Sequence, residues 1–163
     1  MRKMLSNGLA VFAGVVSLPV AQTPANSAKP ATAEHRNESA KDPRLAFLRA
    51  FFKQGNCPAA KLSSVFLEAA DTYALDWRLL PSLSFVETSG GKAARNNNLF
   101  GWDSGRAAFS SAAAGIRAVA SSLARSALYR DKDVDGILKT YNGSAGYGRK
   151  VKDVMRRIAP VAD

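Results

Sequence analysis

Residues 77–105 read WRLLPSLSFVETSGGKAARNNNLFGWDSG, and this stretch decides the fold. Its first part, residues 77–88, is apolar on nearly every side when it is wound as a helix. That pattern predicts a helix buried in the middle of its domain. Glu87 is the one acidic residue of this apolar segment, and no basic residue lies between Arg78 and Lys92 to neutralise it.

The helical pattern stops after this glutamate. Gly90 and Gly91 mark the stop, and residues 96–109 (NNNLFGWDSGRAAF) are rich in turn-forming residues. They predict a loop followed by a short β-hairpin, with Asp103-Ser104-Gly105 as its turn.

Amphipathic patterns predict further helices on both sides of this segment. We expect them over about 42–54, 58–76, 111–128, 134–141 and 147–159. Leu128 is expected on the inner face of the third of these, together with Ile116, Val119 and Leu123. The predicted fold class is therefore mainly α (α+β), a helical domain with one short β-hairpin.

The N-terminus predicts export. Residues 1–25 place Arg2 and Lys3 before an apolar run that is shorter than the ~20 residues of a spanning helix. We interpret them as a signal peptide, with an uncleaved anchor as the alternative, and expect a periplasmic or secreted protein without stable membrane insertion after signal removal. Residues 26–42 predict a flexible linker, and residues 43–160 the folded domain.

Composition excludes several kinds of chemistry. The lone histidine, His35, lies in the linker, so the domain lacks Ser-His or Cys-His pairs and the usual zinc ligand sets. Cys57 is the only cysteine and is expected to be buried and inert. We expect no metal and no cofactor. The formal net charge of +10 favours a polyanionic partner, such as nucleic acid, an anionic membrane or a cell-wall polymer.

Carboxylate chemistry remains. Glu87 shares a helix face with Leu80 and Leu83 and lies in the last turn, where the helix dipole disfavours negative charge. Burial and the dipole both raise a carboxyl pKa, and a protonated glutamic acid can donate its proton in glycoside hydrolysis. The alternative is a helix-end glutamate that caps loop amides or faces water. Glu68 falls on a polar helix face and is expected to be solvated.

These residues resemble a known family. The block LLPSLSFVETSGG, followed by NNLFGWDSG and TYNGSAGYGRKV, is similar to the lysozyme superfamily, above all to bacterial glucosaminidase-like domains (mannosyl-glycoprotein endo-β-N-acetylglucosaminidase-like). The Tyr-Asn block has lytic transglycosylase-like features. The resemblance covers about residues 62–158. It implies a lysozyme-like fold that cleaves the β-1,4 glycan of peptidoglycan.

The resemblance also implies roles for single residues. The catalytic set would be Glu87, Asp103 and Tyr141, and the substrate-binding set Thr88, Asn98, Gly101, Trp102 and Asn142. Glu87 would be the general acid, and Trp102 would offer a platform to a sugar ring, unless it is a core aromatic. Asp103 is the candidate second carboxylate, but it is equally suited to a turn.

Several functions stay open at this point. The leading expectation is a glycosidase, either a glucosaminidase or muramidase or else a lytic transglycosylase that uses the same glutamate. A non-catalytic peptidoglycan-binding module on the same fold is the second. A basic nucleic-acid binder is the third, and the export signal argues against it. We expect the protein to act on peptidoglycan as a monomer, with no nucleic-acid partner.

Overall fold

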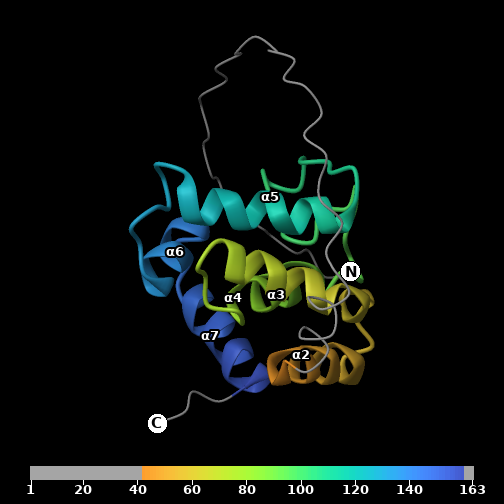
Figure 1. Cartoon of the computed structure of the whole chain (residues 1–163). Coiled ribbons are helices and arrows are strands. Elements are labelled where there is room, and N and C mark those ends of the chain that lie inside the picture. Colours follow the sequence, from red (N-terminus) through yellow and green to blue (C-terminus); the bar gives the residue numbers. More distant parts are fainter. Residues whose placement is uncertain (1–41, 160–163) are drawn as a thin grey trace, which may run out of the picture.

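The computed structural model describes residues 42–159, and this part of the chain is mainly helical (Figure 1). Its elements are α2 (Pro43–Gln54), the 3-10 helix η1 (Pro58–Leu62), α3 (Ser63–Thr72), α4 (Leu79–Thr88), α5 (Ala112–Arg125), α6 (Val134–Tyr141) and α7 (Tyr147–Ile158). The mainly α prediction is confirmed. The predicted signal peptide and nearly all of the predicted linker lie outside the described residues.

The helix boundaries follow from local capping. Asp42 begins α2 because its Oδ1 accepts a hydrogen bond from the backbone N–H of Arg44 at 2.9 Å. Ser111 begins α5 in the same way, since its hydroxyl accepts from the N–H of Ala114 at 3.1 Å. Both starts agree with the sequence. The helix expected over 58–76 is instead divided into η1 and α3, and α4 begins two residues later than expected.

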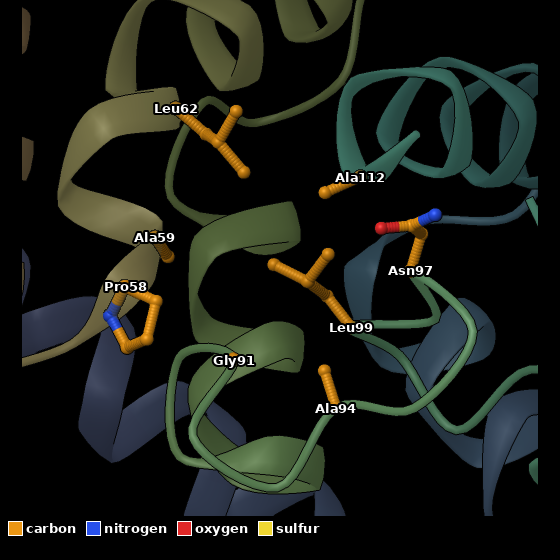
Figure 2. A pocket seen from close by; sticks show the side chains of 8 residues that line it. All are labelled: Pro58, Ala59, Leu62, Gly91, Ala94, Asn97, Leu99 and Ala112. Carbon is orange, nitrogen blue, oxygen red and sulfur yellow. The ribbon is translucent and has the colours of Figure 1, made fainter. Parts of the chain in front are cut away.

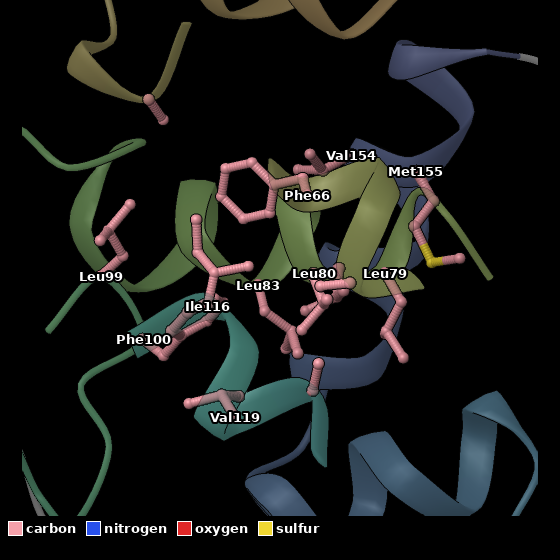
Figure 3. Close-up of a cluster of buried hydrophobic side chains, with 14 of the residues drawn as sticks. Phe66, Leu79, Leu80, Leu83, Leu99, Phe100, Ile116, Val119, Val154 and Met155 are labelled. Atoms are coloured by element: carbon pink, nitrogen blue, oxygen red, sulfur yellow. The ribbon is translucent and has the colours of Figure 1, made fainter. Parts of the chain in front are cut away.

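Helix α4 lies at the centre of the fold. In Figure 1, α3 and α4 lie between α5 and α2, and α4 packs along α7. Leu79, Leu80 and Leu83 of α4 are completely buried. Figure 3 shows them among side chains of three other helices: Phe66 of α3, Ile116 and Val119 of α5, and Val154 and Met155 of α7. The prediction of a central buried helix is confirmed, and Glu87 sits in its last turn.

The predicted β-hairpin is wrong. Residues 42–159 contain no β-strand, and the only trace of pairing there is an isolated bridge between Arg95 and Asn98. A strand needs an extended backbone, but several residues of this segment have left-handed φ values. These are Asn96 (52°), Asn97 (59°), Gly101 (59°), Asp103 (52°), Ser104 (54°) and Gly105 (83°). The segment is therefore a chain of turns, and the expected turn at 103–105 is one of them.

The inward placement predicted for Leu128 is also wrong. Helix α5 ends at Arg125, and Ser126 takes an extended conformation (φ −68°, ψ 149°). The residues that follow leave the helical register, so Leu128 is 40% exposed. The rest of that face is buried as expected. Cys57 is buried and unpaired, also as expected.

None of the helices within residues 42–159 combines the length and the apolar character needed to cross a bilayer.

Two leucines test this description of the core. Leu83→Ala should lower the free energy of unfolding by about 2–5 kcal/mol, because it leaves a cavity beside α4. Leu128→Ala, the matched control on the surface, should change it by less than about 0.5 kcal/mol. Denaturant unfolding followed by circular dichroism measures both. Equal losses in the two variants would contradict the placement of Leu128.

Candidate active site

Glu87 is held where the buried helix meets the surface. Helix α4 stops one residue after it, because Ser89 adopts a left-handed conformation (φ 54°). The N–H of Ser89 bonds to the carbonyl of Phe85, and the N–H of Gly90 bonds to that of Ser84 at 3.1 Å. This pattern closes a helix end and turns the chain away. The Glu87 side chain is left half-buried.

The carboxyl of Glu87 has a raised pKa. Burial is the main cause, since it penalises the charged form. Two neighbours act in the opposite direction: a hydrogen bond from Tyr147 and the positive charge of Lys150 both lower the pKa. Burial outweighs them, so this carboxyl retains its proton at higher pH than an exposed glutamate does.

Tyr147 is the direct partner of Glu87. Its hydroxyl donates to Glu87 Oε1 at 2.6 Å, joining α4 to the first residue of α7. Tyr147 is buried, and burial, followed by the nearby Glu87, raises the pKa of its phenol far above the usual range. The phenol therefore stays protonated and acts as a hydrogen-bond donor to the carboxyl.

Three further aromatic side chains lie beside this pair. The Tyr141 ring stacks on Tyr147, with centroids 6.1 Å apart and planes 7° apart. The ring centroid of Trp102 lies 5.8 Å from that of Tyr141 and 6.1 Å from that of Tyr129. The Tyr141 hydroxyl donates to the carbonyl of Phe100 at 2.5 Å. Trp102 and Tyr141, predicted from distant parts of the sequence, are thus brought together next to the partner of Glu87.

Gly101 brings the loop backbone against the other carboxyl oxygen. A Cβ atom built on Gly101 would lie 3.2 Å from Glu87 Oε2. The residue also has φ of +59°, a conformation that side chains disfavour. A side chain here would need a disfavoured backbone conformation and a small shift of the Glu87 carboxyl, so glycine suits this position and lets the loop backbone lie beside Glu87.

Asn98 organises this loop from within. Its side chain is buried. The Oδ1 atom accepts hydrogen bonds from the backbone N–H groups of Phe100 at 3.3 Å and Trp102 at 2.9 Å. The Nδ2 atom donates to the backbone carbonyls of Trp102 at 3.0 Å and Ala107 at 3.2 Å. Both of its polar atoms are thus engaged by the loop itself. Its contribution to the site is to shape the backbone around Gly101.

Thr88 has a similar role at the end of α4. It is buried, and its hydroxyl lies 2.8 Å from the Leu99 carbonyl and accepts from the N–H of Gly91 at 3.1 Å. It joins the helix end to the loop that carries Gly101 and Trp102. Like Asn98, it lies behind the surface that a substrate would contact.

Two predicted site residues point elsewhere. Asp103 is exposed, and its carboxylate pairs with Arg106 at 2.7 Å, within its own turn. Asn142 is exposed, and its side-chain oxygen accepts from the N–H of Ser144 at 3.0 Å. Neither side chain is hydrogen-bonded to Glu87, Tyr141 or Tyr147. The turn interpretation of Asp103 is the one that the structure displays.

Tyr147 is the site residue that sequence reasoning missed. Its signal lies in the last helix: Tyr147 precedes Val151 by four residues and so shares the apolar face of α7. A tyrosine on a buried face needs a partner for its hydroxyl. The sequence does not say which acceptor that is, because a backbone carbonyl serves as well, as the carbonyl of Phe100 does for Tyr141.

A separate cavity of about 230 Å³ opens between η1, the loop after α4 and the start of α5 (Figure 2). Pro58, Leu62, Leu99 and Ala112 contribute apolar side chains to its lining, and Asn97 contributes a polar one. Glu87 and the aromatic residues beside it do not line this cavity. Within residues 42–159, no cluster of three or more His, Cys, Asp or Glu side chains is placed to hold a metal ion.

The chain matches no protein-family model, no curated protein and no solved structure.

Removal of the tyrosine hydroxyl should change the titration of Glu87. In Tyr147→Phe the carboxyl loses a hydrogen bond that favours its charged form, so its pKa should rise further. NMR titration of the ¹³C-labelled glutamate carboxyls, with Glu87→Gln to assign the signal, measures this shift. Tyr73→Phe is the control, because Tyr73 lies at the end of α3 with Arg125 over its ring and does not bond to Glu87. It should leave the Glu87 pKa unchanged. A Glu87 pKa that stays constant or falls in Tyr147→Phe would show that the bond is not made in solution.

The structural role of Asn98 is tested separately. Asn98→Ala should lower the free energy of unfolding by about 1–3 kcal/mol, because it leaves buried loop groups without partners. Asn142→Ala removes an exposed amide of the same type and should cost less than about 0.5 kcal/mol. Thermal and denaturant unfolding measure both. If Asn98→Ala is as stable as Asn142→Ala, the loop is held by other contacts.

Proposed function

We propose that the protein is a peptidoglycan glycan-strand hydrolase of the endo-β-N-acetylglucosaminidase type, with a lysozyme-like domain and Glu87 as its general acid. The observation that carries this proposal is the half-buried Glu87 carboxyl, whose pKa is raised and whose Oε1 is held by Tyr147. The loop and aromatic residues on which the family resemblance rests, Gly101, Trp102 and Tyr141, lie around it.

The two carboxyl oxygens take different parts in the proposed reaction. Because Tyr147 donates to Oε1, the acidic proton is carried by Oε2, the oxygen beside Gly101. From there it is transferred to the glycosidic oxygen as the bond to the anomeric carbon breaks. The carboxylate that remains is stabilised by the Tyr147 hydroxyl, since hydrogen bonds to a charged acceptor are the stronger ones.

The aromatic residues support the same function. Trp102 is half-buried, so part of its ring is accessible, and its other contacts fix it against Tyr141 and Tyr129. A fixed, partly exposed indole suits stacking with a sugar ring. Tyr141 would act indirectly, by holding Tyr147 in place. Its hydroxyl is bonded to the Phe100 carbonyl, and its ring stacks on Tyr147.

Lytic transglycosylation is the second candidate. The exposed position of Asp103, without a hydrogen bond to Glu87, favours it. A hydrolase benefits from a second carboxylate that activates water or steadies the positively charged sugar. Asp103, the candidate for that role, is exposed and paired with Arg106. With one carboxylate, Glu87 would act first as acid and then as base, and a hydroxyl of the sugar itself would close an anhydro ring.

The remaining parts of the proposal concern location and partners. Residues 1–25 would direct export to the periplasm or the exterior, and residues 26–42 would tether the domain of residues 43–160. The protein would work as a monomer, without metal or cofactor. The positive net charge would raise the local concentration of the anionic polymer.

Substitution of the acid tests the proposal. Glu87→Gln keeps the size of the side chain and can still accept the Tyr147 hydrogen bond, but it has no proton to donate at neutral pH. The initial rate of peptidoglycan solubilisation should fall by about 10²–10⁴-fold, the usual contribution of a general acid. A turbidity assay on purified sacculi measures the rate, and circular dichroism checks the fold.

Glu68→Gln is the matched control, because Glu68 is an exposed glutamate paired with Arg117. It should retain the activity of the unmodified protein. Mass spectrometry of the released fragments separates reducing GlcNAc, reducing MurNAc and anhydro ends. Full activity in Glu87→Gln would refute the proposal. A protein that binds sacculi and releases nothing would instead be a non-catalytic binding module.

A further inference from the structure

Helix α7 carries five cationic side chains, and three of them have partners within the fold. Lys152 pairs with Asp135 at 2.7 Å, Arg156 pairs with Asp153, and Arg157 lies over the rings of Phe51 and Phe85. Arg149 and Lys150 are exposed, and neither forms an ion pair with any residue of 42–159. Packing and surface ion pairs therefore account for the other three cations of α7 but not for these two.

Lys150 differs from Arg149 in its position relative to Glu87. It follows Tyr147 by three residues, so the two side chains lie on the same face of α7, and Tyr147 is bonded to Glu87. Its charge reaches the Glu87 carboxyl. Arg149 follows Tyr147 by two residues and points away from that face. Lys150 is thus an exposed ammonium group at the edge of the candidate site, without an ion-pair partner among residues 42–159.

This lysine does not serve the acid itself. Its positive charge favours the ionised form of Glu87, whereas the proposed reaction needs the protonated form. The other influences on the pKa of this carboxyl are burial, which raises it, and the hydrogen bond from Tyr147, which lowers it. An anion bound to Lys150 would cancel its charge at the moment when the acid has to be protonated. The placement of Lys150 is therefore better suited to a negatively charged substrate than to a neutral one.

We propose that the Lys150 ammonium binds a carboxylate of the glycan substrate and makes the site prefer anionic glycans over neutral ones. The peptide-substituted sugars of peptidoglycan carry such carboxylates, whereas chitooligosaccharides have the same β-1,4 N-acetylated backbone without them. This inference rests on the proposed function, since it assigns a substrate-selecting residue to the same site.

The test compares these two glycans in the full-length protein. Soluble peptidoglycan strands with intact stem peptides and chitooligosaccharides of similar length are used for both cleavage and binding. Binding is measured by calorimetry in a Glu87→Gln background, so that no turnover occurs. Lys150→Gln removes the charge, Lys150→Arg keeps it, and Arg149→Gln removes an equal charge from a neighbouring position that faces elsewhere.

Lys150→Gln should weaken binding and lower kcat/KM for the anionic glycan by about two- to fivefold, the effect of one exposed ion pair. It should neither weaken binding of the neutral glycan nor slow its cleavage, because loss of the lysine charge favours the protonated form of Glu87. The loss should shrink as salt is raised. Lys150→Arg should retain the preference, and Arg149→Gln should not reduce it. The inference is overturned if Lys150→Gln loses binding and kcat/KM equally on both glycans, or if Arg149→Gln loses as much as Lys150→Gln does. In either case, cleavage that still depends on Glu87 leaves the proposed function intact.

The two proposals fail in different ways. A protein that cleaves neither glycan contradicts the proposed function, and the binding measurements then decide the role of Lys150 alone. If Lys150→Gln binds the anionic glycan as tightly as the unmodified protein does, Lys150 does not select it.

Discussion

The hydrogen bond between Tyr147 and Glu87 is the contact on which the candidate site depends. It joins the end of α4 to the start of α7, and these two helices also pack together through the core. The same core desolvates the carboxyl and buries the phenol, so packing and titration have a common origin. The state of the acid is therefore a property of the whole helical assembly and not of the glutamate alone.

The loop beside the acid is ordered without a β-sheet. Its backbone groups are satisfied by the side chains of Asn98 and Thr88 and by short-range turns. Such side-chain bonds replace the ladder that a hairpin would supply, since buried backbone groups need partners of some kind. This explains how a chain of left-handed residues can still present Gly101 and Trp102 in fixed positions.

The sequence predicted the helices well and the loop poorly. The apolar character of residues 77–88 on nearly every side identified α4. Apolar periodicity identified the inner face of α7, because a repeat over several turns averages out local exceptions. The prediction of a hairpin was wrong because Asn and Gly suit both a hairpin turn and a run of left-handed residues. Only tertiary contacts choose between the two. The prediction for Leu128 was wrong because nothing in the apolar pattern of residues 111–128 marks the end of α5 at Arg125.

The candidate site was predicted in the same uneven way. Glu87 could be chosen from its place at the end of the apolar helix, and Trp102 and Tyr141 from the family resemblance. The structure gathers the two aromatic residues beside the partner of Glu87. The pairing of Glu87 with Tyr147 could not be chosen, since it joins residues 60 positions apart in the chain. Asn98 and Thr88 were predicted to bind substrate, but in the structure both side chains are buried and bond to the backbone of the loop.

The turn at Asp103-Ser104-Gly105 has a consequence for how this domain can vary. A Cβ on Gly105 would meet no atom within 4 Å, so this side of the tip borders open space. The N–H of Gly105 nevertheless bonds to the carbonyl of Gly101 at 2.9 Å, the residue whose backbone lies beside the Glu87 carboxyl. Side-chain size can therefore vary at Gly105 more freely than chain length, because an inserted residue would have to keep this bond for the loop to hold its place.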